Sequence, residues 1–219
     1  MTTLADPERA LAITHAPAAT HAALTALFAL DEKMGGVVAS TSEPMIGLMR
    51  LAWWREALEK LDSDRAPAEP LLKDIAAHIL PTGVSGAALG AIEDGWAALL
   101  DGEPDEAAVA RHGRERGRAL FACAATILGA HDDRIAAAGE GWALADLAHR
   151  HSAVAVRAMA REQGRAVLAG LPRRAWPKRA RPLAMLAMLA RRDVAGDSAR
   201  LQGSPQRMIR MLALRLTGR

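Results

Sequence analysis

The sequence contains no tyrosine, only two phenylalanines and a single cysteine, Cys123. One cysteine excludes an internal disulfide and a zinc site made of four cysteines. Valine, isoleucine and threonine are also sparse, whereas alanine, leucine, methionine and arginine dominate, and this balance favours helix over sheet. Because neither a long linker nor a fixed-period repeat divides the 219 residues, we expect one all-α domain over residues 1–219.

Long apolar runs are missing as well. The longest, such as "ALFACAATILGA" and "PLAMLAMLA", are too short to cross a bilayer, and no basic segment followed by an apolar one opens the sequence. A lone cysteine within an apolar run fits a reducing compartment. We therefore expect a cytoplasmic protein, and peripheral contact at the inner face of a membrane stays open.

The charges are divided unevenly along the chain. Residues 1–149 carry 12 Lys and Arg against 22 Asp and Glu, a net charge of −10, whereas residues 150–219 carry 16 against 3, a net charge of +13. The arginine-rich third, residues 150–219, can attract an anionic lipid, a diphosphate or an acidic partner, or it can complement the acidic part of the same fold. It contains one aromatic residue, Trp176, so we expect no nucleic-acid binding.

Two helices are predicted near the start of the sequence. The segment "HAPAATHAALTALFALDEKMGG", residues 15–36, has the acids Asp31 and Glu32 near its end and Gly35 or Gly36 as its terminating residue. The segment "MIGLMRLAWWREALEKLDSD", residues 45–64, has apolar residues at helical spacing. This spacing predicts a broad buried stripe through Met45, Leu48, Met49, Ala52, Trp53, Leu58 and Leu61.

The adjacent tryptophans Trp53 and Trp54 are the most unusual local feature. Neighbouring residues on a helix point about 100° apart, so one indole can lie in the core while the other lines a pocket or an interface. Arg50 precedes Trp54 by four residues, and this spacing allows its guanidinium to stack on the indole. The alternative is that both indoles are packing residues beside solvated arginines.

Carboxylates four residues apart on one helix hold magnesium diphosphates in many all-α enzymes, because both oxygens then lie on one side of the helix. Asp31 is followed at that spacing by Gly35 and not by an acid. The spacing itself occurs in two places beside turn or helix-end residues, which we interpret as helix caps: Asp101/Asp105 and Asp193/Asp197. The residues alone therefore predict no metal site.

Two stretches carry a resemblance to a known family. The first is "HAALTALFALDEKMGGVVASTSEPMIGLMRLAWWREALEKL", in which the block "RLAWWREAL" is the distinctive part, and the second is "AGEGWALADLAHR". Both resemble segments of the squalene/phytoene synthase family. The resemblance implies a single-domain helical bundle of the isoprenoid synthase type, abbreviated in this chain, with a site for magnesium and isoprenoid diphosphates.

The sequence departs from the family's motifs where metal is bound. The first aspartate-rich motif falls on "DEKMG", in which Asp31 and Glu32 match and Gly35 does not, and the second falls on Arg150 and Val154. The tyrosines of the family's active sites are absent. The pattern resembles the non-catalytic branch of the family, which includes a mitochondrial complex I assembly factor. We therefore expect a pseudoenzyme without metal or cofactor that binds a partner protein, an isoprenoid diphosphate or an anionic lipid.

Two alternatives stay open. An active magnesium-dependent prenyl transferase that condenses isoprenoid diphosphates would use Asp31, Glu32 and Asp146. A membrane-surface scaffold would use the arginine-rich third instead. For the leading hypothesis, Arg150 would attract an anion, and the ligand- or partner-binding residues would lie together at the mouth of the former active site: Arg50, Trp53, Trp54 and Arg55.

Overall fold

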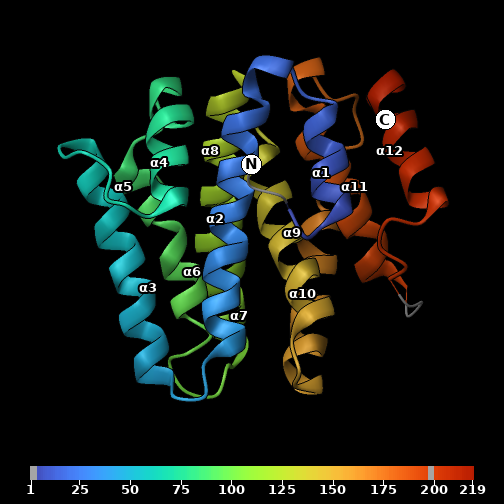
Figure 1. Ribbon diagram of the computed structural model, residues 1–219. Helices are drawn as coiled ribbons and strands as arrows, with labels where there is room; N and C mark the ends of the chain where they lie inside the picture. The colour runs from blue at the N-terminus through green and yellow to red at the C-terminus, as the bar shows by residue number, and fades with distance from the viewer. Residues whose placement is uncertain (1–3, 197–199) are drawn as a thin grey trace.

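The computed structural model describes residues 4–196 and 200–219, and within these residues the chain forms helices and no strand (Figure 1). The prediction of an all-α protein is confirmed. The helices are α1 (Pro7–Thr14), α2 (His21–Ser40), α3 (Pro44–Glu59), α4 (Pro70–His78), α5 (Gly86–Gly90), α6 (Ile92–Ala97), α7 (Glu106–Arg111), α8 (Ala119–Leu128), α9 (Ile135–Arg150), α10 (Val154–Ala169), α11 (Arg181–Ala195) and α12 (Pro205–Thr217).

A π-helical segment, His112–Arg118, joins α7 to α8. The three pieces form one unbroken helical stretch from Glu106 to Leu128. Asp105 caps the start of this stretch, because its side chain accepts a hydrogen bond from the backbone N–H of Ala108 at 2.8 Å. A π-helical turn changes the register of side chains along a helix and is frequent at functional sites.

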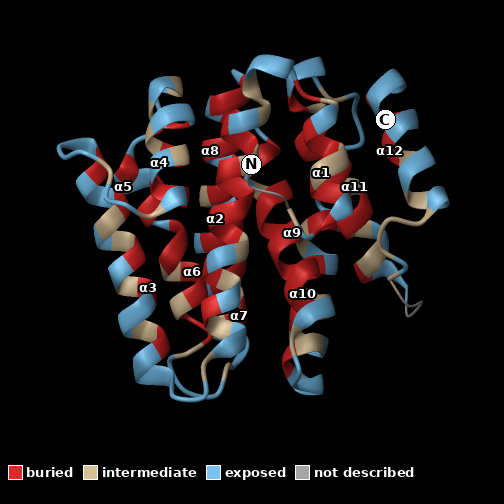
Figure 2. Ribbon diagram, in the orientation of Figure 1, coloured by how far each residue is buried: buried red, intermediate tan, exposed pale blue. Residues whose placement is uncertain are grey.

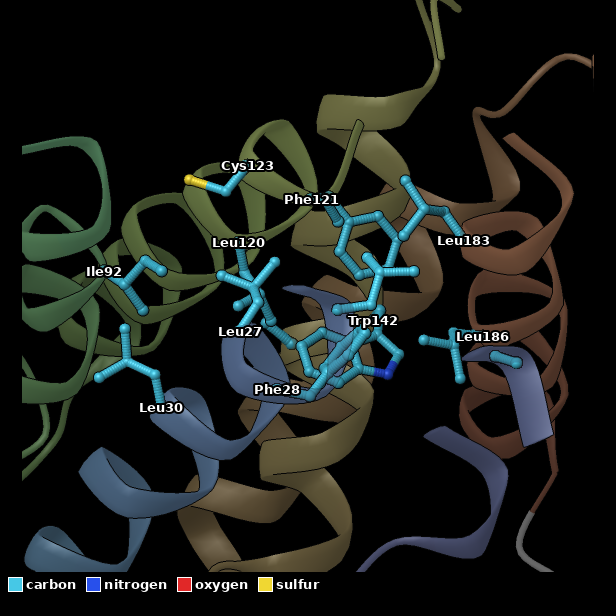
Figure 3. Close-up of a cluster of buried hydrophobic side chains, with 14 of the residues drawn as sticks. Leu27, Phe28, Leu30, Ile92, Leu120, Phe121, Cys123, Trp142, Leu183 and Leu186 are labelled. Atoms are coloured by element: carbon cyan, nitrogen blue, oxygen red, sulfur yellow. The ribbon is translucent and has the colours of Figure 1, made fainter. Parts of the chain in front are cut away.

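Helix α9 lies at the centre of the molecule and packs against α8, α10, α11 and the π-helical segment (Figures 1 and 2). Its Trp142 lies between Phe28 of α2 and Phe121 of α8, with ring centroids 6.2 and 5.5 Å away (Figure 3). Gly139 allows the close approach of the π-helical segment, because a Cβ there would lie 2.2 Å from the carbonyl oxygen of Gly117.

Helix α2 does not end at Gly35 or Gly36 but continues to Ser40, so that part of the prediction is wrong. Gly35 does not end the helix, and its missing side chain instead leaves room for a neighbouring ring. A Cβ at this position would lie 2.8 Å from the indole of Trp96, whose ring fills the space beside the helix. Asp31 therefore lies in the middle of α2 and is fully buried.

The predicted stripe of α3 is wrong in part. Leu58 and Leu61 are buried as predicted, but Met45, Met49 and Trp53 are 68%, 66% and 49% exposed. The rest of the buried face consists of Gly47, Leu51 and Trp54. Apolar residues surround most of this helix, so their spacing alone does not select one face. The side of α3 that contains Gly47 is turned inward, because a residue without a side chain lets the helix approach Leu100 and Thr41 closely. As a result α3, which lies at one edge of the molecule (Figure 2), exposes the apolar side chains of Met45, Ile46, Met49 and Trp53.

Within the described residues, no single helix is long and apolar enough to span a bilayer. The segments Pro70–Thr82 and Gly86–Ala97 meet that criterion only together, and they are bent by 119° relative to each other.

Candidate functional site

Two buried aspartates from different helices share one arginine at the centre of the fold. Asp31 of α2 accepts from Arg116 twice, from Nε at 2.7 Å and from Nη2 at 2.8 Å. The same Nη2 donates to Asp146 of α9 at 2.9 Å. All three side chains are buried, so the guanidinium of the π-helical segment supplies the positive charge that two buried carboxylates need.

Further donors and two indoles enclose this contact. Trp96 Nε1 donates to Asp31 at 3.1 Å, and Arg9 Nη1 of α1 donates to the same carboxylate at 3.0 Å. The Arg116 guanidinium carbon lies 4.1 Å from the ring centroid of Trp96 and 4.8 Å from that of Trp142. A guanidinium between two aromatic faces gains cation–π attraction, so Arg116 is held by its charge and by its shape.

His112 lies behind Arg116, one helical turn earlier. Its Nδ1 is 2.7 Å from the carbonyl oxygen of Gly95, and its Nε2 is 3.2 Å from Arg116 Nη1. A carbonyl can only accept and a guanidinium can only donate, so this ring is neutral and carries its proton on Nδ1. Burial and the charge of Arg116 lower the pKa of His112 to about 3.

The arginines also set the protonation of the two aspartates. Burial alone would raise the pKa of Asp31, but the charge and hydrogen bonds of Arg116, followed by the charge of Arg9, outweigh it and lower the pKa. The pKa of Asp146 lies far below its ordinary value, since Arg116, Arg9 and Arg150 together overcome the effect of burial. Both carboxylates are therefore ionised at neutral pH.

This core belongs to a larger arginine–carboxylate cluster that joins the two ends of the chain. Arg150 Nε donates to Asp146 at 2.8 Å. Near the C-terminus, Arg207 pairs with Glu8 and with Asp193, at 2.9 Å in each case through Nη2. The members of the arginine–carboxylate cluster are Asp6, Glu8, Arg9, Asp31, Arg116, Asp146, Arg150, Asp193, Arg200 and Arg207.

The prediction that Asp193 caps a helix is wrong, since its carboxylate pairs with Arg207. Asp197, its predicted partner in that pattern, lies outside the described residues.

A cavity of about 790 Å³ opens beside the arginine–carboxylate cluster. Its wall includes Asp31, Asp146, Glu32 and the half-exposed side chain of Arg150. Glu32 Oε2 accepts from the backbone N–H of Ala5 at 3.1 Å. The structure thus brings four predicted site residues to one cavity, where the half-exposed Arg150 pairs with Asp146 and Asp6.

A magnesium ion, which the resemblance implies for an active enzyme, does not fit the residues of this cavity. Both oxygens of Asp31 and both oxygens of Asp146 accept hydrogen bonds from arginine. The cation of Arg116 lies between the two carboxylates that would have to ligate the ion. Among the residues that the structure describes, no group of three or more His, Cys, Asp or Glu side chains could hold a metal ion.

The other predicted residues lie elsewhere. Arg50, Trp53 and Trp54 line a separate groove of about 570 Å³ on α3, together with Lys33, Ile46, Met49 and Glu69. Trp54 is buried and Trp53 is exposed, so the two indoles divide between core and surface as their spacing suggests. The cation over the Trp54 ring is Lys33, with its Nζ 5.8 Å from the centroid, and not Arg50, whose spacing allows the same contact.

Arg55 lines neither space. Its Nη1 lies 3.5 Å from Glu93 Oε2 of α6, and its Nε lies 4.0 Å from Glu59 Oε1. The prediction that Arg50, Trp53, Trp54 and Arg55 gather at the mouth of the Asp31 site is therefore wrong. The turn of α3 that buries Trp54 directs Trp53 to the outer groove and Arg55 toward α6.

Sequence reasoning missed the side chains that define the central site, namely Arg9, Trp96, His112 and Arg116. The one local signal is "HGRERGR", in which glycines lie beside a histidine and several arginines. Glycines in a helical segment can mark close packing, and Gly113 and Gly117 here pack closely against α9. Comparison with known proteins finds no family model, no curated protein and no solved structure that matches this chain.

Proposed function

We propose that this protein is a non-catalytic binding protein with the helical architecture of the squalene/phytoene synthases, and that its ligand is a partner protein. The observation that carries the proposal is the position of Arg116, which donates to Asp31 and to Asp146 at 2.7–2.9 Å. In the alternative of an active enzyme, Asp31 and Asp146 would help to hold magnesium, and the guanidinium of Arg116 occupies the position between these two carboxylates.

The energetics oppose exchange of this arginine for a metal ion. Breaking a buried ion pair costs about 3–5 kcal/mol, because an uncompensated charge is left in a low-dielectric site. Metal ions stabilise a departing diphosphate by several kcal/mol, so their exclusion slows condensation by orders of magnitude. Gly35 adds a steric reason. An aspartate at position 35 would collide with the indole of Trp96. This indole cannot easily move aside, because its Nε1–H donates a hydrogen bond to Asp31.

The apolar surface of α3 supports a protein partner. Methionine and tryptophan are enriched in the cores of protein interfaces, and methionine adapts its shape to the surface that it meets. Met45, Ile46, Met49 and Trp53 form this exposed surface, and the groove among them also contains Lys33, Arg50 and Glu69. Charges of both signs beside an apolar groove suit a polypeptide, which offers apolar side chains together with charged ones.

The absence of catalysis can be tested directly. The purified protein is incubated with farnesyl diphosphate or geranylgeranyl diphosphate, and pyrophosphate release is measured with and without Mg²⁺. We expect no magnesium-dependent release. Turnover that is lost in Asp31→Asn and Asp146→Asn would overturn the proposal and support the active prenyl transferase, with Glu32 as the next residue to replace.

Partner binding needs a separate test. Proteins that co-purify with the wild type are quantified and compared with those of Met49→Glu, which places a charge in the α3 groove. Ser63→Glu is the matched control, because it adds the same charge at an exposed position beyond the end of α3. The proposal predicts a stoichiometric partner that Met49→Glu loses and Ser63→Glu retains. An equal loss in both variants would reject the α3 groove as the binding site.

The cavity beside Arg150 favours a second candidate, the binding of an isoprenoid diphosphate or an anionic lipid. Its volume of about 790 Å³ is in the range of small-ligand sites. A ligand that binds only the native state raises the melting temperature. A shift with farnesyl diphosphate that needs no Mg²⁺ and disappears in Arg150→Ala would support this candidate, and the absence of any shift would reject it.

A further inference from the structure

Helix α12 has apolar side chains on two opposite faces. One face is buried against α11 and α1 through Met211 and Leu214. On the other side, Ile209 and Leu216 are 66% and 73% exposed, and Leu212 is also exposed. The second set recurs at i, i+3 and i+7, which places it on one stripe along the helix. Burial in the fold therefore accounts for only one of the two faces.

Arginines lie on both sides of the exposed stripe. On a helix of 3.6 residues per turn, the exposed Arg215 lies about 60° from Leu212 on one side of the stripe, and its Nη1 is 3.2 Å from His15 Nδ1. The half-buried Arg210 lies about 100° from Ile209 on the other side, toward the buried face. Residues 200–219 contain five arginines and no acidic residue. Two of the five, Arg200 and Arg207, serve the arginine–carboxylate cluster inside the fold. Of the other three, Arg215 and Arg219 are exposed and Arg210 is half-buried.

The neighbouring segment adds more positive charge at the C-terminal end of α12. The backbone N–H of Trp176 donates to the carbonyl oxygen of Gly218 at 2.8 Å, and Arg181 Nη1 donates to the carbonyl oxygen of Leu216 at 3.4 Å. These contacts fix α12 beside residues 173–181. Arg173 and Lys178 are exposed there, so the stripe has cationic neighbours from a second segment. Helix α12 and α3 lie at opposite edges of the molecule (Figure 1).

We propose that the outer face of α12 binds the surface of an anionic lipid membrane, with the helix parallel to that surface. Apolar side chains flanked by arginines are the pattern of helices that lie in a membrane interface, where the apolar stripe enters the acyl region and the cations meet lipid phosphates. The surface around α12 is complementary in charge to such a membrane. A second copy of the same face would bring arginines against arginines, which disfavours self-association.

This inference does not depend on the proposed function. The α3 surface carries charges of both signs, including Glu43 and Glu56 near its exposed apolar residues, and it does not share the cationic character of α12. The two surfaces therefore fit two different kinds of partner. A protein bound at α3 leaves α12 free, because the helices lie at opposite edges (Figures 1 and 2).

The test is co-sedimentation of the full chain with vesicles of phosphatidylcholine alone or mixed with phosphatidylglycerol. We expect binding to the anionic vesicles that weakens as NaCl is raised, since the screening length falls from about 10 Å at 0.1 M to about 3 Å at 1 M. The double variant Ile209→Ser/Leu216→Ser keeps every charge and removes exposed apolar surface. Its affinity should be lower by about tenfold or more.

The matched control is Met45→Ser/Met49→Ser, which removes exposed apolar surface from α3 and should bind the vesicles as the wild type does. Circular dichroism of both variants establishes that the fold is intact. Three results would overturn the proposal: no binding to anionic vesicles, equal binding to neutral ones, or an equal loss in the α3 control. A concentration-dependent dimer that Ile209→Ser/Leu216→Ser abolishes would assign the α12 face to a second copy instead.

Discussion

Replacing Arg116 by methionine tests whether this arginine neutralises the two buried aspartates. Methionine keeps an unbranched apolar side chain between the indoles of Trp96 and Trp142 and removes the charge. Asp31 would lose its two closest donors, at 2.7 and 2.8 Å, and Asp146 would lose one at 2.9 Å. Removal of one partner from a buried pair costs about 3–5 kcal/mol. That is a large part of the ~5–15 kcal/mol that stabilises an ordinary domain.

Urea unfolding at pH 7, followed by circular dichroism, measures the change in the free energy of unfolding. The matched control is Arg111→Met in the adjoining helix α7, whose half-exposed guanidinium lies 3.8 Å from the half-exposed carboxylate of Asp94. Exposed ion pairs are worth about 0–1 kcal/mol, so this variant should lose little.

The double variant Arg116→Met/Asp31→Asn separates the ion pair from packing. Once the aspartate is neutral, loss of the arginine leaves less charge uncompensated, so the combined loss should be smaller than the sum of the single losses by at least about 1 kcal/mol. A loss below about 1 kcal/mol in Arg116→Met, or strictly additive effects, would refute the reasoning.

Three further predictions concern other positions. Gly35→Ala should lower the free energy of unfolding by about 1–3 kcal/mol, because the new methyl group overpacks against Trp96. Gly36→Ala has no atom within 4 Å of the new Cβ and should raise the free energy of unfolding by about 0.8–1 kcal/mol through helix propensity. Chemical unfolding should therefore give changes of opposite sign, and a loss in both variants would contradict the packing argument. His112 has a pKa of about 3 in the folded protein, against an ordinary value of 6.5, so between these pH values the unfolded chain binds one more proton than the folded one. The contribution of His112 to the free energy of unfolding is therefore complete above pH 6.5 and falls by about 1.4 kcal/mol for each pH unit below it. The stability of His112→Gln should therefore depend less steeply on pH from 6 to 4, and an unchanged slope would exclude His112 as the source. Burial raises the pKa of Cys123 to about 12, so a thiol reagent at pH 8 should label the protein only after urea unfolds it, and rapid labelling of the native protein would show that the thiol is accessible.

The sequence allows the helical class to be predicted because composition and spacing act locally. It does not determine which side of α3 is buried, since Met49 and Leu51 are both apolar and only the position of neighbouring helices decides between them. The end of α2 was mispredicted for a related reason. Glycine terminates many helices, but Gly35 contacts Trp96, which lies 61 residues further along the chain. A contact between residues so far apart in the sequence produces no local pattern from which it could be predicted.

The central site was likewise predictable from the sequence only in part. Asp31 and Asp146 stand out in the sequence because acids within apolar helices need a reason. Their partners do not, because an arginine that will be buried looks like any solvated arginine until the fold brings it to a carboxylate. Arg116 lies 85 residues from Asp31, and Trp96 lies 65 residues from it. These separations connect helices that no spacing rule links.

The arginine–carboxylate cluster also constrains the order in which the chain can fold during synthesis. Glu8 is synthesised before its partners Arg200 and Arg207, which follow 192 and 199 residues later. Domains generally fold as units once their sequence has emerged. Until Arg200 and Arg207 are translated, Glu8 has no counter-charge from the segment around α12. A chain truncated before Arg200 therefore leaves the buried carboxylate of Glu8 without the two arginines that neutralise it.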